Sequence, residues 1–138
     1  MKIIIAPDSF KGSLSSQQVC EAIGQGIKKV NPGIEIISIP MADGGEGTVD
    51  ALMESLGGRK IEVYVNDPLF RKIKAGYCML PDGKTAVMEM AAASGLTLLA
   101  ENERNPMNTT TYGTGELIKD ALGKGCRNFI IGIGGSAT

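Results

Sequence analysis

The sequence has no histidine and no tryptophan among its 138 residues. Without histidine, the chain cannot supply a Ser-His-Asp triad, a Cys-His pair, an imidazole general base or a histidine-ligated metal. Long apolar runs are also missing, since a membrane-spanning helix needs roughly 18 such residues in a row. The opening run Met1–Ile5 is too short for the apolar part of a signal peptide. We therefore expect neither histidine-based catalysis nor a membrane segment.

The sequence also has few cysteines and a net charge close to zero. Cys20, Cys78 and Cys126 are far apart and form no Cys-x-x-Cys pair, so neither a zinc site nor a thioredoxin-type redox site is indicated. We expect reduced, buried thiols in a cytoplasmic protein. The net charge of −1 gives no support for binding to nucleic acid or to a membrane surface. The hydrophobic content of 43% indicates a folded globular chain.

Glycine, in contrast, is abundant. The chain has 19 glycines, nearly twice the share of roughly 7% that is usual in proteins. Either the chain is loose, or it contains several tight loops in which the backbone must approach a ligand.

The first part of the sequence alternates between strand and helix patterns. Residues 2–6 are a short apolar run, β-branched at three positions, which is typical of a buried strand, and residues 34–39 are predicted as the second strand. Between them, Ser15 and Gln18 form a capping-box pattern that predicts a helix over about 16–30. Strands and helices in alternation are typical of a parallel α/β layer.

A second amphipathic helix follows over 49–56, with Thr48 as its expected N-cap and Gly57 at its end. The pattern changes after this helix, and we place a domain boundary there. Residues 1–57 would be the first part of one α/β domain and residues 58–138 the first part of another.

The second region has the pattern of antiparallel strands. Residues 60–65 alternate as a strand, and residues 73–90 predict a hairpin around Pro81–Gly83. A helix with its body at 116–122 and a strand over 128–133 follow. The sequence then stops in a Gly-rich loop, where an α/β domain normally continues into a helix. We therefore expect the chain to be an N-terminal piece of a longer protein.

Four polar loops lie after a predicted strand or before a predicted helix, where open α/β sheets bind ligands and helices favour anions. They are Asp8–Ser13, Asp43–Thr48, Thr109–Glu116 and Gly132–Thr138.

The first loop offers a carboxylate, an ammonium group and hydroxyls. Lys11 could grip a phosphate or carboxylate, with Asp8 on a hydroxyl or a metal and Ser9 and Ser13 nearby. The alternative is that Asp8 only forms a turn and that Lys11 lies in solvent.

In the second loop, three glycines remove every Cβ at which a ligand would meet backbone N–H groups. Asp43 could act as a general base or hold Mg²⁺ through water. The alternative is that Asp43 and Glu46 only stabilise the dipole of the following helix.

The third loop brings threonine hydroxyls to a helix N-terminus, which suits an anion, although Thr114 could simply cap the helix. In the fourth loop, Gly132, Gly134 and Ala137 fit the loose dinucleotide fingerprint, and a phosphate-cradling loop is the safer interpretation. Glu89 stands in an apolar setting at a strand end, either as a cleft carboxylate or as a helix-start acid.

Together these loops yield the candidate residues. Asp43, Asp8 and Lys11 are the catalytic candidates, with Asp43 also the candidate metal ligand. The candidates for binding substrate or phosphate are Ser9, Ser13, Gly44, Gly45, Glu46, Glu89, Ser94, Thr110, Thr114, Gly134, Gly135 and Ser136.

Five segments, in this order, resemble the bacterial-type glycerate kinase family across the whole chain. They are Ala6–Leu14, Ala42–Thr48, Glu89–Leu96, Gly113–Ile118 and Ile131–Thr138. The resemblance implies ATP-dependent phosphorylation of D-glycerate to a phosphoglycerate, with 2-phosphoglycerate favoured, and with Mg²⁺, in the cytoplasm. It implies a flavodoxin-like, Rossmann-like domain made from both ends of the chain, an inserted α/β domain, and an active site in the cleft between them.

The sequence departs from the family in its length. Family members are much longer and continue from Gly-Gly-Ser-Ala-Thr into Asn-Asp-Gly-Gly, so we expect the isolated chain to be inactive. A non-catalytic nucleotide- or anion-binding module and a dinucleotide-dependent oxidoreductase are the alternatives. We expect small-molecule partners only, and the oligomeric state stays open.

Overall fold

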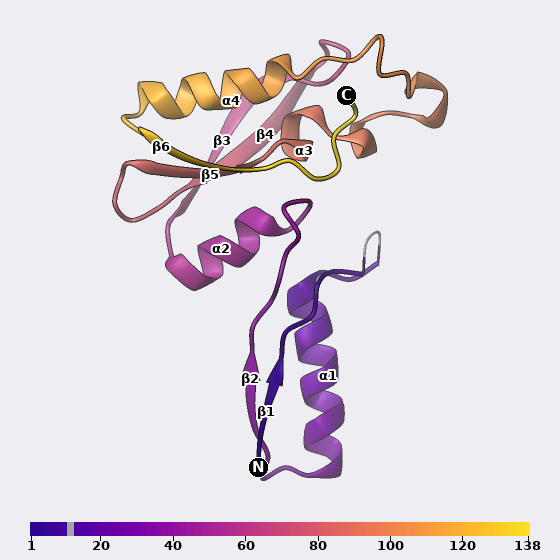
Figure 1. Cartoon of the computed structure of the whole chain (residues 1–138), viewed down its shortest axis with the longest axis vertical. Helices are drawn as coiled ribbons and strands as arrows, with labels where there is room; N and C mark the ends of the chain where they lie inside the picture. The colour runs from indigo at the N-terminus through magenta and orange to yellow at the C-terminus, as the bar shows by residue number, and fades with distance from the viewer. Residues whose placement is uncertain (11–12) are drawn as a thin grey trace. The chain divides into compact units, whose positions relative to one another are not determined.

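The computed structural model describes residues 1–10 and 13–138, which fold into two compact units, Met1–Asp43 and Gly44–Thr138. One unit holds a two-stranded sheet with one helix packed on it, and the other holds a four-stranded sheet with several helices (Figure 1). Parallel and antiparallel strands are both present, which confirms the expected mixed α/β class.

The first unit is a single strand–helix–strand motif. Strands β1 (Lys2–Ile5) and β2 (Glu35–Ser38) are parallel, and helix α1 (Ser16–Val30) connects them (Figure 1). The predicted capping box is confirmed, because Ser15 Oγ accepts the Gln18 N–H at 3.2 Å and Gln18 Oε1 accepts the Ser15 N–H at 2.9 Å. The local pattern therefore decided where this helix begins.

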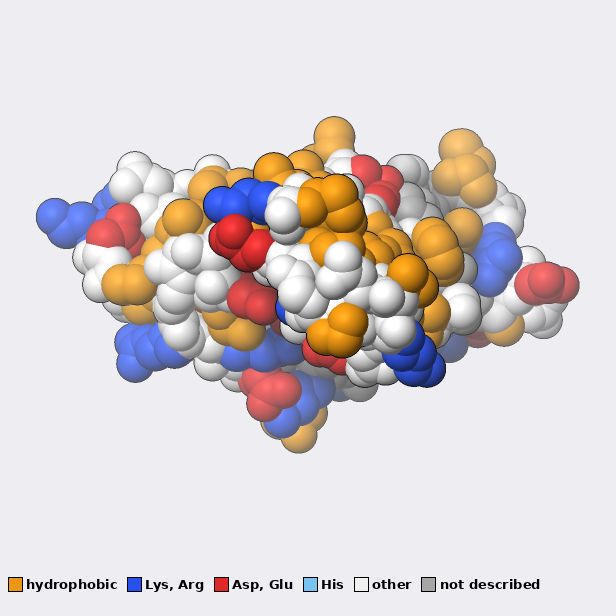
Figure 2. Space-filling view, turned by 90° about the horizontal axis from the view of Figure 1, so that it is seen from below, with side chains coloured by type: hydrophobic (Ala, Val, Ile, Leu, Met, Phe, Trp, Pro, Cys, Tyr) orange, Lys and Arg blue, Asp and Glu red, His pale blue; other side chains and the backbone are white. Residues whose placement is uncertain are grey.

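Among the residues that the structure describes, helix α1 covers one face of this small sheet. The buried apolar residues of the unit are Ile5, Val19, Cys20 and Ile34. On the other face, Ile4 pairs in register with Ile37 and is 62% exposed. Apolar side chains also reach the surface between charged ones on the face that Figure 2 presents.

The second unit contains a mixed sheet in the order β3-β4-β5-β6. Strands β3 (Arg59–Asn66), β4 (Lys72–Met79) and β5 (Thr85–Glu89) are antiparallel, which confirms the predicted strand and hairpin. Strand β6 (Asn128–Gly132) instead runs parallel to β5, so this region is not purely antiparallel. The parallel pair brings two carboxyl strand ends to one edge of the sheet.

Helices cover both faces of this sheet (Figure 1). Helix α4 (Tyr112–Gly123) packs on one face, and the shared cluster includes Val65, Tyr77, Met88, Leu117 and Ala121. Helix α2 (Thr48–Leu56) packs on the other face, where Val49 joins Cys78 and Val87. The connection from β5 to α4 contains the short helix α3 (Ala91–Ser94) and two 3₁₀ turns, Leu96–Leu98 and Glu101–Glu103. The three cysteines are buried and free, as expected.

One predicted N-cap, Thr48, and one N-cap offered as an alternative, Thr114, are wrong. Thr48 is the first residue of α2 and not its N-cap, because Gly47 takes the cap position with a φ of 91°. The Thr48 hydroxyl donates to the Gly45 carbonyl at 2.8 Å. Helix α4 begins at Tyr112 with Thr111 at the N-cap, so Thr114 lies within the helix.

The division between the compact units falls between Asp43 and Gly44, because α2 packs on the second sheet. The domain boundary expected near Gly57 concerns the complete family fold and stays a prediction. Over the described residues, no helix is long and apolar enough to cross a membrane.

Candidate active site

Two chain segments meet where the parallel strands β5 and β6 end. Glu89 is the register partner of Gly132, and the Met90 N–H donates to the Gly132 carbonyl at 2.8 Å. Beyond the strands, the Ala137 N–H donates to the Ser94 carbonyl at 2.9 Å. The loop after β6 therefore lies against α3, which directly follows β5.

The Gly-rich loop before α2 packs against the same strand end. The Gly134 N–H donates to the Gly44 carbonyl at 3.0 Å. A Cβ added to Gly134 would lie 2.8 Å from the Gly45 Cα, and one added to Gly132 would collide with the Gly44 carbonyl. Glycine at positions 132 and 134 is thus required for the close approach of these two backbones.

A carboxylate lies beside this loop. Glu89 is half-buried, and its Oε1 accepts the Val49 N–H of α2 at 2.8 Å. Burial raises the pKa of Glu89, and the backbone N–H groups of Val49 and Gly47 oppose this rise by stabilising the charged form. Glu89 thus contacts the start of α2 and also lines a pocket, and its role in ligand binding stays a prediction.

The N-terminus of α4 also contacts the segments that meet at the ends of β5 and β6. Thr114 Oγ1 lies 2.7 Å from Ser94 Oγ, and both side chains are buried. Thr109 Oγ1 donates to the Ala137 carbonyl at 3.0 Å, which ties the loop after β6 to the segment before α4. Ser94 and Thr114 therefore hold the loops together, and their roles in ligand binding stay predictions.

The remaining candidates of this unit lie on the same loops. Thr110 Oγ1 accepts the Tyr112 N–H at 3.2 Å, and the Ser136 hydroxyl lies 2.9 Å from that of Thr138. Glu46 is exposed, and Gly135 has a φ of 76°, which favours glycine. The structure thus brings ten of the predicted binding residues into one loop cluster.

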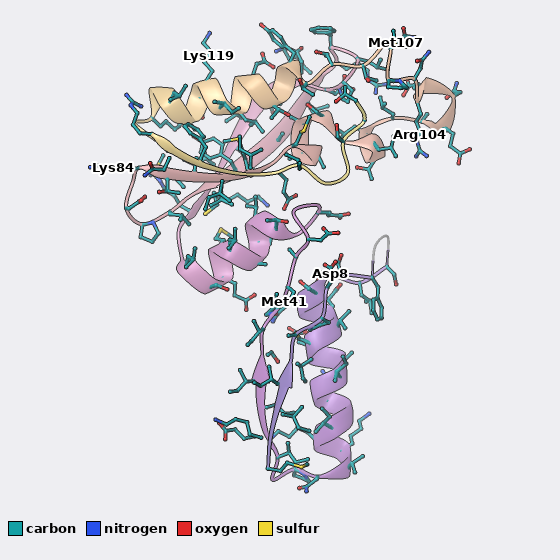
Figure 3. All side chains as sticks on the ribbon, in the orientation of Figure 1. Asp8, Met41, Lys84, Arg104, Met107 and Lys119 are labelled. Atoms are coloured by element: carbon teal, nitrogen blue, oxygen red, sulfur yellow. The ribbon has the colours of Figure 1, made fainter. Side chains whose placement is uncertain are left out.

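The candidates of the first unit lie at the carboxyl end of its own parallel pair. The pairing extends beyond the strands, because the Met41 N–H donates to the Pro7 carbonyl at 3.0 Å. Asp8 and Met41 are both labelled in Figure 3, and Asp43 follows two residues after Met41. Asp8 Oδ1 accepts the Ser9 N–H at 2.7 Å.

Two further candidates belong to the loop after β1. Ser13 is exposed and donates its N–H to the Phe10 carbonyl at 2.7 Å. Lys11 lies outside the described residues. The roles of all these residues stay predictions.

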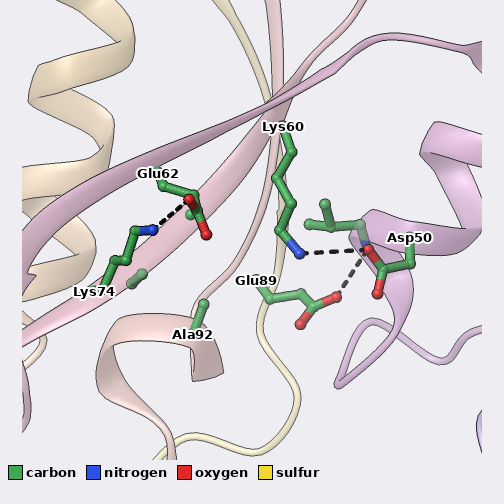
Figure 4. Close-up of a pocket in the computed structure, with 9 residues that line it drawn as sticks. Asp50, Lys60, Glu62, Lys74, Glu89 and Ala92 are labelled. Carbon is green, nitrogen blue, oxygen red and sulfur yellow. Dashed lines mark hydrogen bonds and ion pairs between the residues drawn. The ribbon is translucent and has the colours of Figure 1, made fainter.

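A pocket of about 250 Å³ opens beside Glu89 on the α2 face of the second sheet (Figure 4). It is lined by Asp50, Lys60, Glu62, Lys74, Glu89 and Ala92, among others. Its two ammonium groups are paired, since Lys74 lies 2.6 Å from a Glu62 oxygen and Lys60 lies 3.8 Å from an Asp50 oxygen. The hydrogen bond from Lys74 lowers the pKa of Glu62. An incoming anion would have to compete with these acids.

Sequence reasoning missed two contacts that position α4. A Cβ on Gly113 would overlap the Asn66 carbonyl, so this helix can approach β3 only through a glycine. Glu116 accepts both the Asn66 N–H, at 2.6 Å, and its side-chain amide, at 2.9 Å. Burial opposes the charge of Glu116, but the hydrogen bonds from Asn66 and Lys72 outweigh it and lower its pKa. The glycine pair Gly113 and Gly115 within a helix is the signal that could have pointed to this contact.

Metal ligands are sparse in the described part of the chain, where no group of three or more His, Cys, Asp or Glu side chains could hold a metal ion. Magnesium often binds through only one or two carboxylates together with substrate phosphates. Such a mode matches an exposed carboxylate such as that of Asp43, which precedes the Gly-rich loop.

Comparison with known proteins identifies the family of the chain. The model of the glycerate kinase family matches residues 3–138. A glycerate kinase of Bacillus subtilis is 57% identical over 138 residues, which are 100% of this chain and 36% of that protein. The glycerate 2-kinase of Escherichia coli is 51% identical with the same coverage.

A solved structure agrees with these sequence comparisons. The crystal structure of a glycerate kinase 2 from Salmonella typhimurium LT2 superposes with a TM-score of 0.79 at 49% identity. The match covers 99% of this chain and 36% of that one. The chain thus spans about a third of the length of the relatives that it matches.

Proposed function

Because the chain belongs to the glycerate kinase family, we propose that it forms part of an ATP-dependent kinase that phosphorylates D-glycerate. We infer 2-phosphoglycerate as the product, since the Escherichia coli relative is named a glycerate 2-kinase. The observation that carries this proposal is the packing of two Gly-rich loops at the carboxyl ends of β5 and β6. Such strand ends are where open α/β sheets bind ligands.

Phosphoryl transfer depends mainly on positioning and on charge stabilisation, so it needs no histidine. In our proposal the loops Gly44–Gly45 and Gly134–Ser136 approach the phosphate, and its oxygens are bound by backbone N–H groups other than that of Gly134, which donates to the Gly44 carbonyl. Asp43 accepts the proton of the glycerate hydroxyl, and Asp8 and Lys11 bind the substrate. Support for this assignment comes from the position of Asp43, an exposed residue next in sequence to the Gly44 loop.

ATP is the phosphate donor that a kinase requires, and we propose Mg²⁺ as its companion ion. In the alternative role of Asp43, in place of that of proton acceptor, its carboxylate would hold the ion through water, together with the ATP phosphates. When bound, Mg²⁺ neutralises charge that develops on the phosphate oxygens.

We also propose a cytoplasmic location, supported by three buried cysteines that form no disulfide. The domain arrangement that we propose is that of the family, with residues 1–57 in one domain and 58–138 in the domain inserted into it. The isolated chain would then lack part of the machinery and be inactive.

An Asp43→Ala variant tests the assignment. We would assay a chimera in which this chain replaces the matching segment of the Bacillus subtilis relative, and measure ADP release with D-glycerate. Loss of a general base lowers kcat by about 100-fold or more. The matched control is Asp50→Ala, which removes an exposed acid whose ion pair with Lys60 is weak.

The same assay separates the alternatives. A kinase that keeps near-normal kcat after Asp43→Ala would contradict the role of Asp43. ATP binding without glycerate-dependent turnover in the unmutated chimera would favour a binding module, and tight NAD binding would favour an oxidoreductase.

A further inference from the structure

Helix α2 has no cap from its own sequence. Its N-cap residue is Gly47, which has no side chain to accept a hydrogen bond from the first turn. The first N–H groups of any helix lack partners within the helix and need acceptors from elsewhere. Here an acceptor comes from the sheet, because Glu89 Oε1 accepts the Val49 N–H at 2.8 Å from 40 positions away in the sequence.

The loop in front of α2 is held by contacts of its own and by contacts with distant parts of the chain. Within the loop, the Thr48 hydroxyl donates to the Gly45 carbonyl at 2.8 Å. Gly44 and Gly47 both have a φ near 90°, a conformation that glycine adopts freely. Because glycine has more conformational freedom than other residues in the unfolded chain, ordering this loop costs more entropy. At one end, the Gly44 carbonyl accepts the Gly134 N–H at 3.0 Å. At the other end, Glu89 holds the start of α2.

The chemistry of this contact favours a hydrogen-bond acceptor over a ligand-binding group. The Glu89 carboxylate shares its pocket with Asp50 and with Lys60, which is paired with Asp50. Burial raises the pKa of Glu89, and the negative charges of Asp50 and Glu46 add to this rise. A second anion placed against it would meet repulsion in a partly buried setting. The α2 N-terminus is therefore already occupied by a protein carboxylate.

We propose that Glu89 is a positioning residue, which anchors the Gly44–Gly47 loop in its site-forming conformation by capping α2 and does not itself bind the substrate. This inference rests on the proposed function only in assigning that loop to the phosphate site. A phosphate would then be bound by the loop backbones, because Glu89 fills the anion position of α2.

Three variants distinguish an acceptor from a charged ligand. Glu89→Gln keeps an oxygen that can accept the Val49 N–H, whereas Glu89→Ala removes every acceptor. Glu62→Gln is the matched control, because it changes an exposed glutamate that lines the same pocket. Amide hydrogen exchange of residues 44–50 is measured in the full chain, and kcat and KM are measured in the chimera described above.

We expect Glu89→Ala to speed exchange of the amides at 44–50 by about tenfold, the effect of a lost helix cap. It should also lower kcat by about tenfold or more. In Glu89→Gln, the exchange rates at 44–50 and kcat should both stay within about threefold of the wild-type values. Glu62→Gln should leave the exchange rates unchanged.

Two results would overturn the proposal. One is a Glu89→Gln variant as inactive as Glu89→Ala, since that would mean that the charge itself is required. The other is unchanged exchange in a folded Glu89→Ala variant. If Glu89→Ala does not fold, the activity of Glu89→Gln alone decides between the two roles. A chimera without kinase activity would refute the proposed function, while the exchange experiment would still test the anchoring.

Discussion

The parallel pairs β1–β2 and β5–β6 have the same local design in different surroundings. Each pair ends in a polar loop at its carboxyl edge. The pair β1–β2 stands as a two-stranded sheet with α1 on one face, whereas β5–β6 is extended by β3 and β4 and is covered by helices on both faces. The same local motif can therefore be packed to very different degrees.

Burial differs accordingly. In the first unit Ile4, a strand residue, is 62% exposed, and Val30 of α1 is 88% exposed. In the second unit Tyr77, Met88 and Leu117 are fully buried. Since buried apolar area supplies most of the stabilisation of a fold, the second unit should be the more stable one. The loop cluster around Glu89 belongs to this better-packed unit.

The largest effect should appear in thiol labelling of the full chain. Cys20 is buried in the first unit, and Cys126 is buried in the core of the second. Because the first unit has less buried apolar surface, we expect Cys20 to react about 100-fold faster than Cys126 at moderate urea concentration. Mass spectrometry of the labelled peptides gives both rates, normalised to those of the unfolded chain. Faster labelling of Cys126 would reverse the comparison.

The next effect concerns a glycine at a close contact within the second unit. Gly113→Ala would push a Cβ into the Asn66 carbonyl, and we expect the free energy of unfolding to fall by about 1–3 kcal/mol. Tyrosine fluorescence reports on this unit alone, because Tyr64, Tyr77 and Tyr112 all lie in it.

Gly115→Ala, in the same helix, is the control. A Cβ there has no neighbour within 4 Å, so alanine should raise stability by up to about 1 kcal/mol. Gly26 in α1 has the same open space and should behave like Gly115. Equal destabilisation by Gly113→Ala and Gly115→Ala would contradict the packing role of Gly113.

The smallest effect is a pH dependence from Glu89. Burial raises its pKa above the ordinary value of 4.5, so its contribution to stability is present below that value and is lost as the pH rises through the raised pKa. We therefore expect the free energy of unfolding of the wild type to fall, relative to Glu89→Gln, between about pH 4 and pH 7. Urea unfolding followed by tyrosine fluorescence measures this difference. If the difference in the free energy of unfolding between the wild type and Glu89→Gln did not change with pH, the Glu89 carboxylate would not be held in a partly buried place.

Local sequence signals predicted most of the elements. The capping box at Ser15 and Gln18 located the start of α1, and the Pro81–Gly83 turn located the β4–β5 hairpin. These signals act within a few residues, so they do not depend on the rest of the fold. The start of α2 was misjudged because its cap comes from Glu89, which no local pattern could connect to Val49.

The sequence by itself determined the family, through motifs in a fixed order, and it indicated that glycine collects in loops beside strands and helices. Only the tertiary structure decided which loops meet. The parallel pairing of β5 with β6 sets Glu89 opposite Gly132, and the backbones of Gly44 and Gly134 then bond across the strand ends. The physical reason is the distance along the sequence over which each interaction acts. Helix propensity and capping act between near neighbours, whereas strand pairing joins residues that lie far apart in the chain.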